Sequence, residues 1–169
     1  MKVSHESYTG GTSIRGLQPP PAVSSEKVLI VDSHAPSCPD VVCLKARRDG
    51  HTLGQIVLTP VRLTTNKSTI GGMAIELLWT HQDDKDIAAM LVHKSFELLR
   101  KQGCPFVVVA GMADYYTRLG FECALNYNIV YDPHTTTEQS FMIRFLSHLP
   151  DRSISGTVQY SKQLDCYCN

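Results

Sequence analysis

Residues 73–121 read MAIELLWTHQDDKDIAAMLVHKSFELLRKQGCPFVVVAGMADYYTRLGF. In order, the pattern predicts a strand, an acidic turn, a long helix, an apolar strand and a short helix over 114–119. A strand, a crossover helix and a second strand in this order form a βαβ unit, whose two strands lie parallel in one sheet. Because the free N–H groups at the start of such a helix attract anions, the turn before it is a candidate anion site.

The long helix is predicted over residues 84–102. Its apolar residues recur at helical spacing, and acidic residues occupy its first turn. Arg100 and Lys101 lie in its last turn, where the helix dipole favours positive charge. Gly103 is a suitable C-terminal stop. The continuous apolar run at 105–110 suits a strand that is buried on both faces, as expected when a crossover helix returns to a parallel neighbour.

The strand predicted at 73–79 has two faces, because side chains alternate along a strand. A carboxylate within a sheet must be paired, solvated at a cleft or raised in pKa. Glu76 is therefore a candidate general base, and pairing with an arginine or lysine is an equal alternative. One predicted face carries Ala74, Glu76 and Leu78, and the other carries Ile75, Leu77 and Trp79.

The rest of the chain is predicted to supply extended segments around this unit. Asp49-Gly50 marks a hairpin turn, and Pro60 favours an edge position or a bulge in its strand. Residues 1–26 are rich in glycine, proline and serine, which predicts a flexible leader before a single domain over 27–169. The extended segments are predicted at 27–32, 41–47, 53–63, 121–131, 140–146 and 155–160.

The composition is that of an ordinary globular protein, with 43% hydrophobic and 19% charged residues. The 16 basic and 16 acidic residues balance, so the charge indicates neither nucleic acid nor a membrane surface as a partner. No apolar run approaches the roughly 20 residues of a membrane span, and no secretory signal is seen, which predicts a cytoplasmic protein. The six cysteines are then expected to be reduced thiols, and their spacings do not match those of zinc sites, so no metal is expected.

The candidate anion site carries three carboxylates, those of Asp83, Asp84 and Asp86. A carboxylate about 5 Å from a phosphate oxygen costs roughly 1–3 kcal/mol at surface-like dielectrics, and Lys85 offsets only one of the three. The alternative is that these residues cap the helix and complement its dipole. Residue chemistry alone favours the helix cap.

Two tyrosines, Tyr115 and Tyr116, precede the final turn of the unit. A tyrosine hydroxyl near a reacting amine or thiolate can serve as a general acid. Paired aromatic residues on a short amphipathic helix are more often core residues, and the core role is favoured here. His81 and His93 are further candidate proton carriers, although a lone histidine is usually neither catalytic nor a ligand.

Several motifs together resemble the GNAT superfamily of acyl-CoA-dependent N-acetyltransferases, and in particular its small predicted acetyltransferases. The block YYTRLGF at 115–121 resembles the superfamily's Tyr-Tyr-x-Arg-x-Gly-Phe signature, which is fairly specific. The stretch GHTLGQI at 50–56 resembles its hairpin into a strand, and residues 73–92 resemble its fourth strand and main helix. The resemblance covers roughly residues 40–165.

The resemblance implies an α/β (α+β) fold, GNAT-like, with a mixed, twisted, partly splayed sheet, one long central helix and a short second helix. It implies acetyl-CoA or another acyl-CoA as the cofactor and transfer to an amine acceptor, either a small molecule or a peptide. Tyr116 takes the position of the superfamily's usual tyrosine, and Glu76 is the nearest candidate base. The residues at the positions that contact the cofactor are Leu78, Trp79, Asp84, Lys85, Asp86, Ile87 and Ala88.

The chain departs from the superfamily pattern at three places. The acidic turn falls on the loop that holds the pyrophosphate, where Asp86 replaces the central glycine. Met112 and Ala113 replace an Asp-Pro pair, and the chain between Asp32 and Val41 leaves little room for the helices that shape the acceptor pocket. The sequence therefore supports two hypotheses, an N-acetyltransferase with an atypical cofactor loop or a GNAT-fold binding or scaffold module without transferase activity. A homodimer through a sheet edge is open under both.

Overall fold

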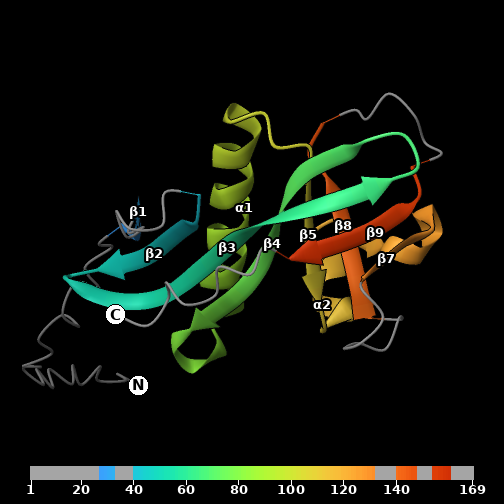
Figure 1. Cartoon of the computed structure of the whole chain (residues 1–169). Helices are drawn as coiled ribbons and strands as arrows, with labels where there is room; N and C mark the ends of the chain where they lie inside the picture. The colour runs from blue at the N-terminus through green and yellow to red at the C-terminus, as the bar shows by residue number, and fades with distance from the viewer. Residues whose placement is uncertain (1–26, 33–39, 132–139, 148–153, 161–169) are drawn as a thin grey trace, which may run out of the picture.

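The structure is a computed structural model of the chain, and it describes residues 27–32, 40–131, 140–147 and 154–160 (Figure 1). The predicted leader at 1–26 lies outside the described residues. The strands are β1 Leu29–Asp32, β2 Val42–Arg48, β3 His51–Thr65, β4 Thr69–Thr80, β5 Phe106–Ala110, β6 Glu122–Cys123, β7 Ile129–Tyr131, β8 Phe141–Phe145 and β9 Gly156–Tyr160. The helices are α1 Lys85–Lys101 and α2 Ala113–Arg118, with 3-10 turns η1 His81–Asp83 and η2 Ala124–Tyr127.

The strands form one mixed sheet in the order β1-β2-β3-β4-β5-β8-β6. The β4–β5 and β7–β9 pairs are parallel, and the other pairs are antiparallel. Two strands share one edge of β3, because β2 pairs with its first half and β9 pairs with its last five residues. Pro60 lies between these two pairings, at a point where that edge of β3 has no partner in the described residues, which confirms its predicted edge position.

Helix α1 packs on one face of the sheet and forms the first core there (Figure 1). Its apolar stripe, with Leu91, Phe96 and Leu99 fully buried, contacts side chains of β2, β3 and β4. A second core lies on the opposite face of the other half of the sheet, around Phe106 and Ile129. One face of the sheet is therefore covered by α1, and the second core packs on the opposite face among β3, β4, β5, β8, β9, β7 and η2.

The parallel strands β4 and β5 pair over a short length and then separate. Their register contains only two residue pairs, Met73 with Val107 and Ala74 with Val108. The rest of β4, residues 75–80, has no partner on its β5 side within the described part of the chain. The sheet is thus splayed at its middle, as the sequence resemblance implied.

A β-bulge in β4 changes which side chains share a face. Opposite β3, Leu77 pairs with Val57 and Ile75 pairs with Leu58, so Glu76 is the extra residue. As a result, Ile75 and Leu78 both pack into the α1 core. The prediction that Leu78 shares a face with Glu76 is therefore wrong, because a bulge shifts the two-residue alternation by one.

The predicted extended segment at 121–131 is only partly extended. It contains β6, the 3-10 turn η2 and then β7. The turn ends at Asn128, whose φ of 52° is left-handed, a conformation that asparagine adopts more readily than most residues. The local sequence has no glycine or proline between Phe121 and Tyr131, so this break left no strong signal.

Gly72→Ala is expected to lower the free energy of unfolding by about 2 kcal/mol. A Cβ at Gly72 would lie 2.4 Å from the ring of Phe106, which is fully buried. The neighbouring glycine is a matched control, since a Cβ at Gly71 would have no atom within 4 Å. Gly71→Ala should change the stability by less than about 0.5 kcal/mol. Urea unfolding of both variants measures the difference, and equal losses would contradict it.

Candidate functional site

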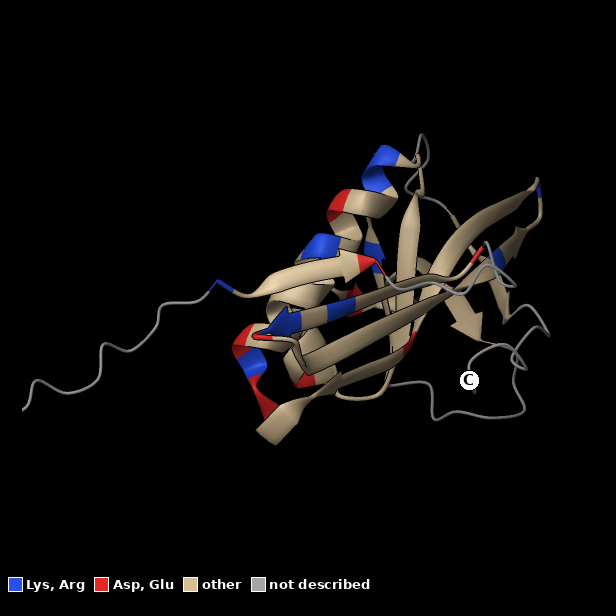
Figure 2. Cartoon of the chain, turned by 90° about the vertical axis from the view of Figure 1, so that its left-hand side faces the viewer, with Lys and Arg blue, Asp and Glu red and all other residues tan. Residues whose placement is uncertain are grey.

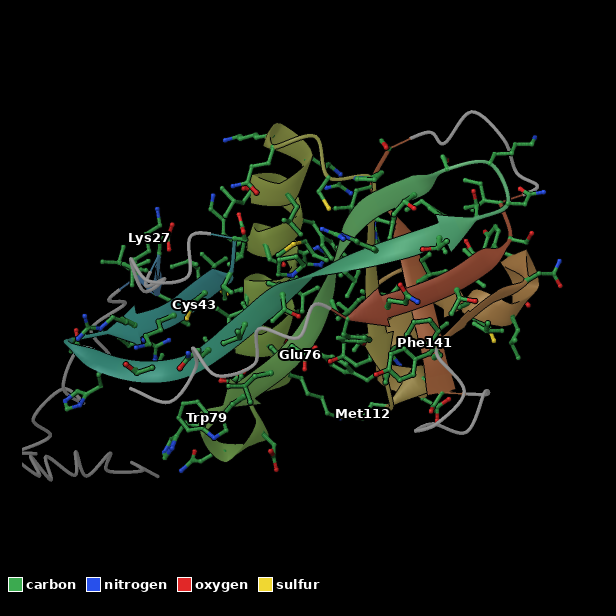
Figure 3. All side chains as sticks on the ribbon, in the orientation of Figure 1. Lys27, Cys43, Glu76, Trp79, Met112 and Phe141 are labelled. Carbon is green, nitrogen blue, oxygen red and sulfur yellow. The ribbon has the colours of Figure 1, made fainter. Side chains whose placement is uncertain are left out.

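The candidate site lies where β4 and β5 separate, beside the start of α1. Figure 3 shows Glu76 and Trp79 on β4, and Met112 just beyond the end of β5. The backbone N–H and C=O groups on the open edge of β4 have no strand partner there in the described residues. An extended ligand can therefore hydrogen-bond to this edge as an added strand does.

Glu76 is the charged residue at the bulge of β4. Thr59 Oγ1 donates a hydrogen bond to Glu76 Oε1 over 3.2 Å. Partial burial raises the pKa of the Glu76 carboxyl, and the Thr59 hydrogen bond offsets part of that rise. Within the described residues no lysine or arginine forms a salt bridge with it, so the pairing alternative is not seen there. A carboxylate with a raised pKa is a stronger base than an ordinary one, which suits it to accept a proton from a reacting amine.

Tyr116 is a core residue in this structure. Its side chain is buried, and its ring contacts those of Tyr115 at 5.2 Å and Phe121 at 5.4 Å between centroids. Burial and the neighbouring Tyr115 raise the pKa of Tyr116 to about 12, which keeps its hydroxyl protonated at neutral pH. The favoured core role is confirmed by this packing, and the hydroxyl still retains a proton that it can donate.

Tyr115 is the other tyrosine whose hydroxyl the sequence offered as a candidate general acid. This hydroxyl is buried and has no hydrogen-bond partner in the described residues. An unpaired buried hydroxyl is costly and uncommon, which makes it a candidate contact for a bound molecule. The Tyr-Tyr pair is the one sequence signal that pointed to this position.

The backbone N–H groups at the start of α1 are capped by the side chain of Asp84. Oδ1 of Asp84 accepts hydrogen bonds from the backbone N–H groups of Asp86 and Ile87, both at 3.0 Å. The backbone carbonyl of Asp84 accepts a further bond from the N–H of Ala88, also at 3.0 Å. Asp84 is therefore the helix cap, as residue chemistry favoured. The two amide groups that would otherwise meet a phosphate are occupied by this carboxylate.

The predicted cofactor-contacting residues fall into two groups. Asp84, Lys85 and Asp86 are exposed in the turn and first residues of α1, and Trp79 is exposed on β4. Figure 2 shows this acidic start of α1 in red and its basic end in blue. The others pack toward the α1 core: Leu78, Ile87 and Ala88, of which Leu78 is half-buried and the other two are buried.

An apolar rim surrounds the place where the strands separate. Leu77 and Trp79 are 46% and 47% exposed on β4, and Met112 is 71% exposed at the start of α2. Met112 has a left-handed backbone, with φ of 45°, at the position where the superfamily has aspartate. Sequence reasoning missed Met112 and Leu77 as site residues, since exposure of an apolar side chain depends on the tertiary structure.

The described residues contain no group of three or more histidine, cysteine, aspartate or glutamate side chains that could hold a metal ion. Across the same residues, no helix combines the length and apolar character that crossing a bilayer requires.

The fold is similar to those of solved acetyltransferases. One is a GNAT family N-acetyltransferase from Escherichia coli in complex with CoA, with a TM-score of 0.67, 20% identity, and coverage of 81% of this chain and 91% of that chain. Another is a GNAT family acetyltransferase from Brucella melitensis in complex with acetyl-CoA, with a TM-score of 0.52, 22% identity, and coverage of 72% of this chain and 66% of that chain. No protein-family model matches the sequence, and no curated protein matches it. The chain therefore has the fold of the GNAT superfamily, with the mixed, splayed sheet and the long central helix that its sequence motifs implied.

Proposed function

We propose that the protein is an acyl-CoA-dependent N-acyltransferase whose donor lies along the open edge of β4. The observation that carries this proposal is the separation of β4 from β5 after Ala74, with a carboxylate at the bulge that follows it. The solved acetyltransferases of the same fold contain CoA or acetyl-CoA, which supports the same class of donor here.

The residues of the site fit the acyl-pantetheine arm of such a donor. The free backbone groups of β4 would hold the amide groups of the arm, and the apolar rim would contact its carbon chain. The start of α1 does not fit the diphosphate, because the Asp84 carboxylate occupies the amide groups of Asp86 and Ile87. We therefore assign the donor's affinity to the arm rather than to its phosphates.

The side chains can carry the protons of the transfer. A bound acyl-CoA supplies a thioester, so that a C–N bond to the amine forms while the C–S bond breaks. Glu76 takes the proton that the attacking amine must lose, either directly or through one water. Tyr116 is the candidate donor of the proton that the departing sulfur requires, since its hydroxyl stays protonated at neutral pH. The Tyr116 proton is replaced from solvent after each turnover.

The second candidate function is a GNAT-fold binding or scaffold module without transferase activity. The Asp84 cap favours it, because the anion site at the start of α1 is filled by the protein itself. Asp83 and Asp86 add further negative charge beside that cap. A cytoplasmic location and a homodimer through a sheet edge stay predictions under both functions.

Calorimetric titration at low salt separates the two functions. Acetyl-CoA and acetyl-pantetheine, which lacks the phosphates and the nucleotide, are expected to bind with affinities within about threefold of each other. Each should raise the melting temperature, because a ligand that binds only the folded state stabilises it. If neither ligand gives heat or a thermal shift at millimolar concentration, the transferase proposal is wrong. Much tighter binding of acetyl-CoA would contradict the closed anion site.

A further inference from the structure

Three aromatic side chains from three strands form a cluster on the sheet face opposite α1. The rings of Tyr131 on β7 and Tyr160 on β9 meet edge to face, with centroids 4.9 Å apart. The rings of Tyr131 and Phe141 on β8 are 5.7 Å apart. Figure 3 shows Phe141 on the β5–β8 side of the site, across from Glu76 on β4. We call Tyr131, Phe141 and Tyr160 the aromatic cluster.

The strand register places Tyr160 on the same face as Glu76. Tyr160 pairs with Val61, which lies two residues from Thr59 on β3. Thr59 pairs with Ala74, which lies two residues before Glu76 on β4. Side chains of directly paired residues, and of residues two apart, share a face of the sheet. The hydrogen bond from Thr59 to Glu76 agrees with this placement.

The Glu76 carboxylate and the Tyr160 hydroxyl lie on this same face of the sheet, and no hydrogen bond joins them in the described residues. Burial raises the pKa of Tyr160, and the charge of Glu76 raises it further. Among the described residues, the hydrogen bond that Glu76 accepts comes from Thr59 and not from Tyr160. A carboxylate oxygen and a hydroxyl oxygen on one face of a sheet can together accept hydrogen bonds from a group with several N–H donors, and we call this pair the seat.

We propose that Glu76 and Tyr160 together seat the ammonium group of the acceptor, and that the acceptor is a primary amine with an apolar substituent and no carboxylate beside its nitrogen. This specificity rests on the proposed function for the transfer itself. An ammonium donates to both oxygens, and the face of a tyrosine ring attracts it further. The apolar substituent would lie against Leu77 and Met112, which are exposed on the rim.

The charges around the seat exclude amino acids. A carboxylate attached to the carbon next to the nitrogen would lie about 5 Å from the Glu76 carboxylate, where like charges repel. Asp83, Asp84 and Asp86 add negative charge at the start of α1, next to the end of β4. Amines with neutral or basic substituents would not be repelled by these carboxylates.

Phenethylamine and phenylalanine form a matched pair of probes, because they differ only by the carboxylate. Binding of each to the full chain is measured by calorimetry or ligand-detected NMR without any acyl donor, at a pH where both amines are protonated. Phenethylamine is expected to bind at least about tenfold more tightly than phenylalanine, the factor that carboxylate repulsion at this distance gives. Equal affinities, or tighter binding of phenylalanine, would overturn the proposal.

Tyr160→Phe tests the seat directly, since it keeps the ring and removes the hydroxyl. Its affinity for phenethylamine is expected to fall about three- to tenfold, while its affinity for acetyl-pantetheine stays unchanged. Tyr127→Phe is the matched control, because the Tyr127 hydroxyl also lies beside a carboxylate, 2.9 Å from Glu122, but outside the site. The control should bind phenethylamine as the parent does, and an equal loss in both variants, or none in Tyr160→Phe, would refute the seat.

The outcomes separate this inference from the proposed function. If phenethylamine binds selectively but neither acetyl-CoA nor acetyl-pantetheine binds, the transferase proposal fails and the amine seat stands. If the donors bind but the two amines do not differ, the seat fails and the transferase proposal stands. The comparison of the two amines uses the unaltered protein, so it does not depend on the folding of any variant.

Discussion

Glu76→Gln is expected to lower kcat/KM for acyl transfer by about 10²- to 10⁴-fold, the usual contribution of a general base. Glutamine has nearly the same size and still accepts the hydrogen bond from Thr59, but it cannot take a proton from the amine. Glu97→Gln is a matched control, because it makes the same change on an exposed carboxylate that binds Lys94 on α1. Full activity in Glu76→Gln would show that Glu76 is not the general base.

The pH dependence gives a second readout of the same change. Burial raises the pKa of Glu76, so the folded protein holds its proton more tightly than the unfolded chain does. Activity should therefore rise as the pH passes upward through the Glu76 pKa, and Glu76→Gln should lack this acidic limb. The charged carboxylate costs stability above that pKa, so the variant should be at least as stable as the parent at pH 8. Thermal melts of both proteins at pH 5 and pH 8 measure this. A melting temperature at pH 8 that is lower for Glu76→Gln than for the parent would contradict it.

The double change Asp84→Gly and Asp86→Gly is expected to increase the affinity for acetyl-CoA by at least about 30-fold. Two carboxylates near a diphosphate each oppose it by roughly 1–3 kcal/mol, and 2 kcal/mol corresponds to about 30-fold. The change also frees the N–H groups of residue 86 and Ile87, which Asp84 now occupies. Glycine is an acceptable N-cap, costing only a few tenths of a kcal/mol at Asp84 and about 1 kcal/mol within the helix at Asp86.

Two control variants separate charge from the freed amide groups. Asp84→Asn removes the charge and keeps a side-chain cap, so it should give a smaller gain than the glycine variant. Asp83→Asn removes a neighbouring charge without freeing any N–H group, since Asp83 does not cap the helix. Acetyl-pantetheine should bind all of these variants as it binds the parent, because it has no phosphates. An unchanged acetyl-CoA affinity in the double variant would show that the loop charges are not what opposes the diphosphate.

The sequence was a good guide where the structure depends on residues close together in the chain. The periodicity of α1, its acidic first turn and its basic last turn predicted the helix to within one residue at each end. The Asp-Gly pair predicted the turn between β2 and β3, where Asp49 and Gly50 both have left-handed backbones. The helix cap was favoured from residue chemistry alone, and the hydrogen bonds of Asp84 confirm it.

The candidate site itself was predicted only in part. Glu76 was identified as a carboxylate in a strand, but its place at a bulge depends on the pairing of β3 with β4 across a hairpin. Sequence reasoning missed Tyr160, because no local pattern says that β9 pairs with the second half of β3. Met112 was noted only as a departure from a motif, and its exposure follows from where β5 ends.

The sequence by itself determined the strand–helix–strand unit, the YYTRLGF block and the closed acidic start of α1, because periodicity, capping and turn chemistry act over a few residues. The tertiary structure decided which side chains meet at the site. When the pairing of two strands slips by one residue, every side chain of the strand moves to the other face of the sheet. The bulge at Glu76 has this effect on the residues that follow it in β4. Glu76 and Tyr160, which is more than 80 residues later in the chain, are placed on one face of the sheet by pairing between distant strands, which local sequence does not encode.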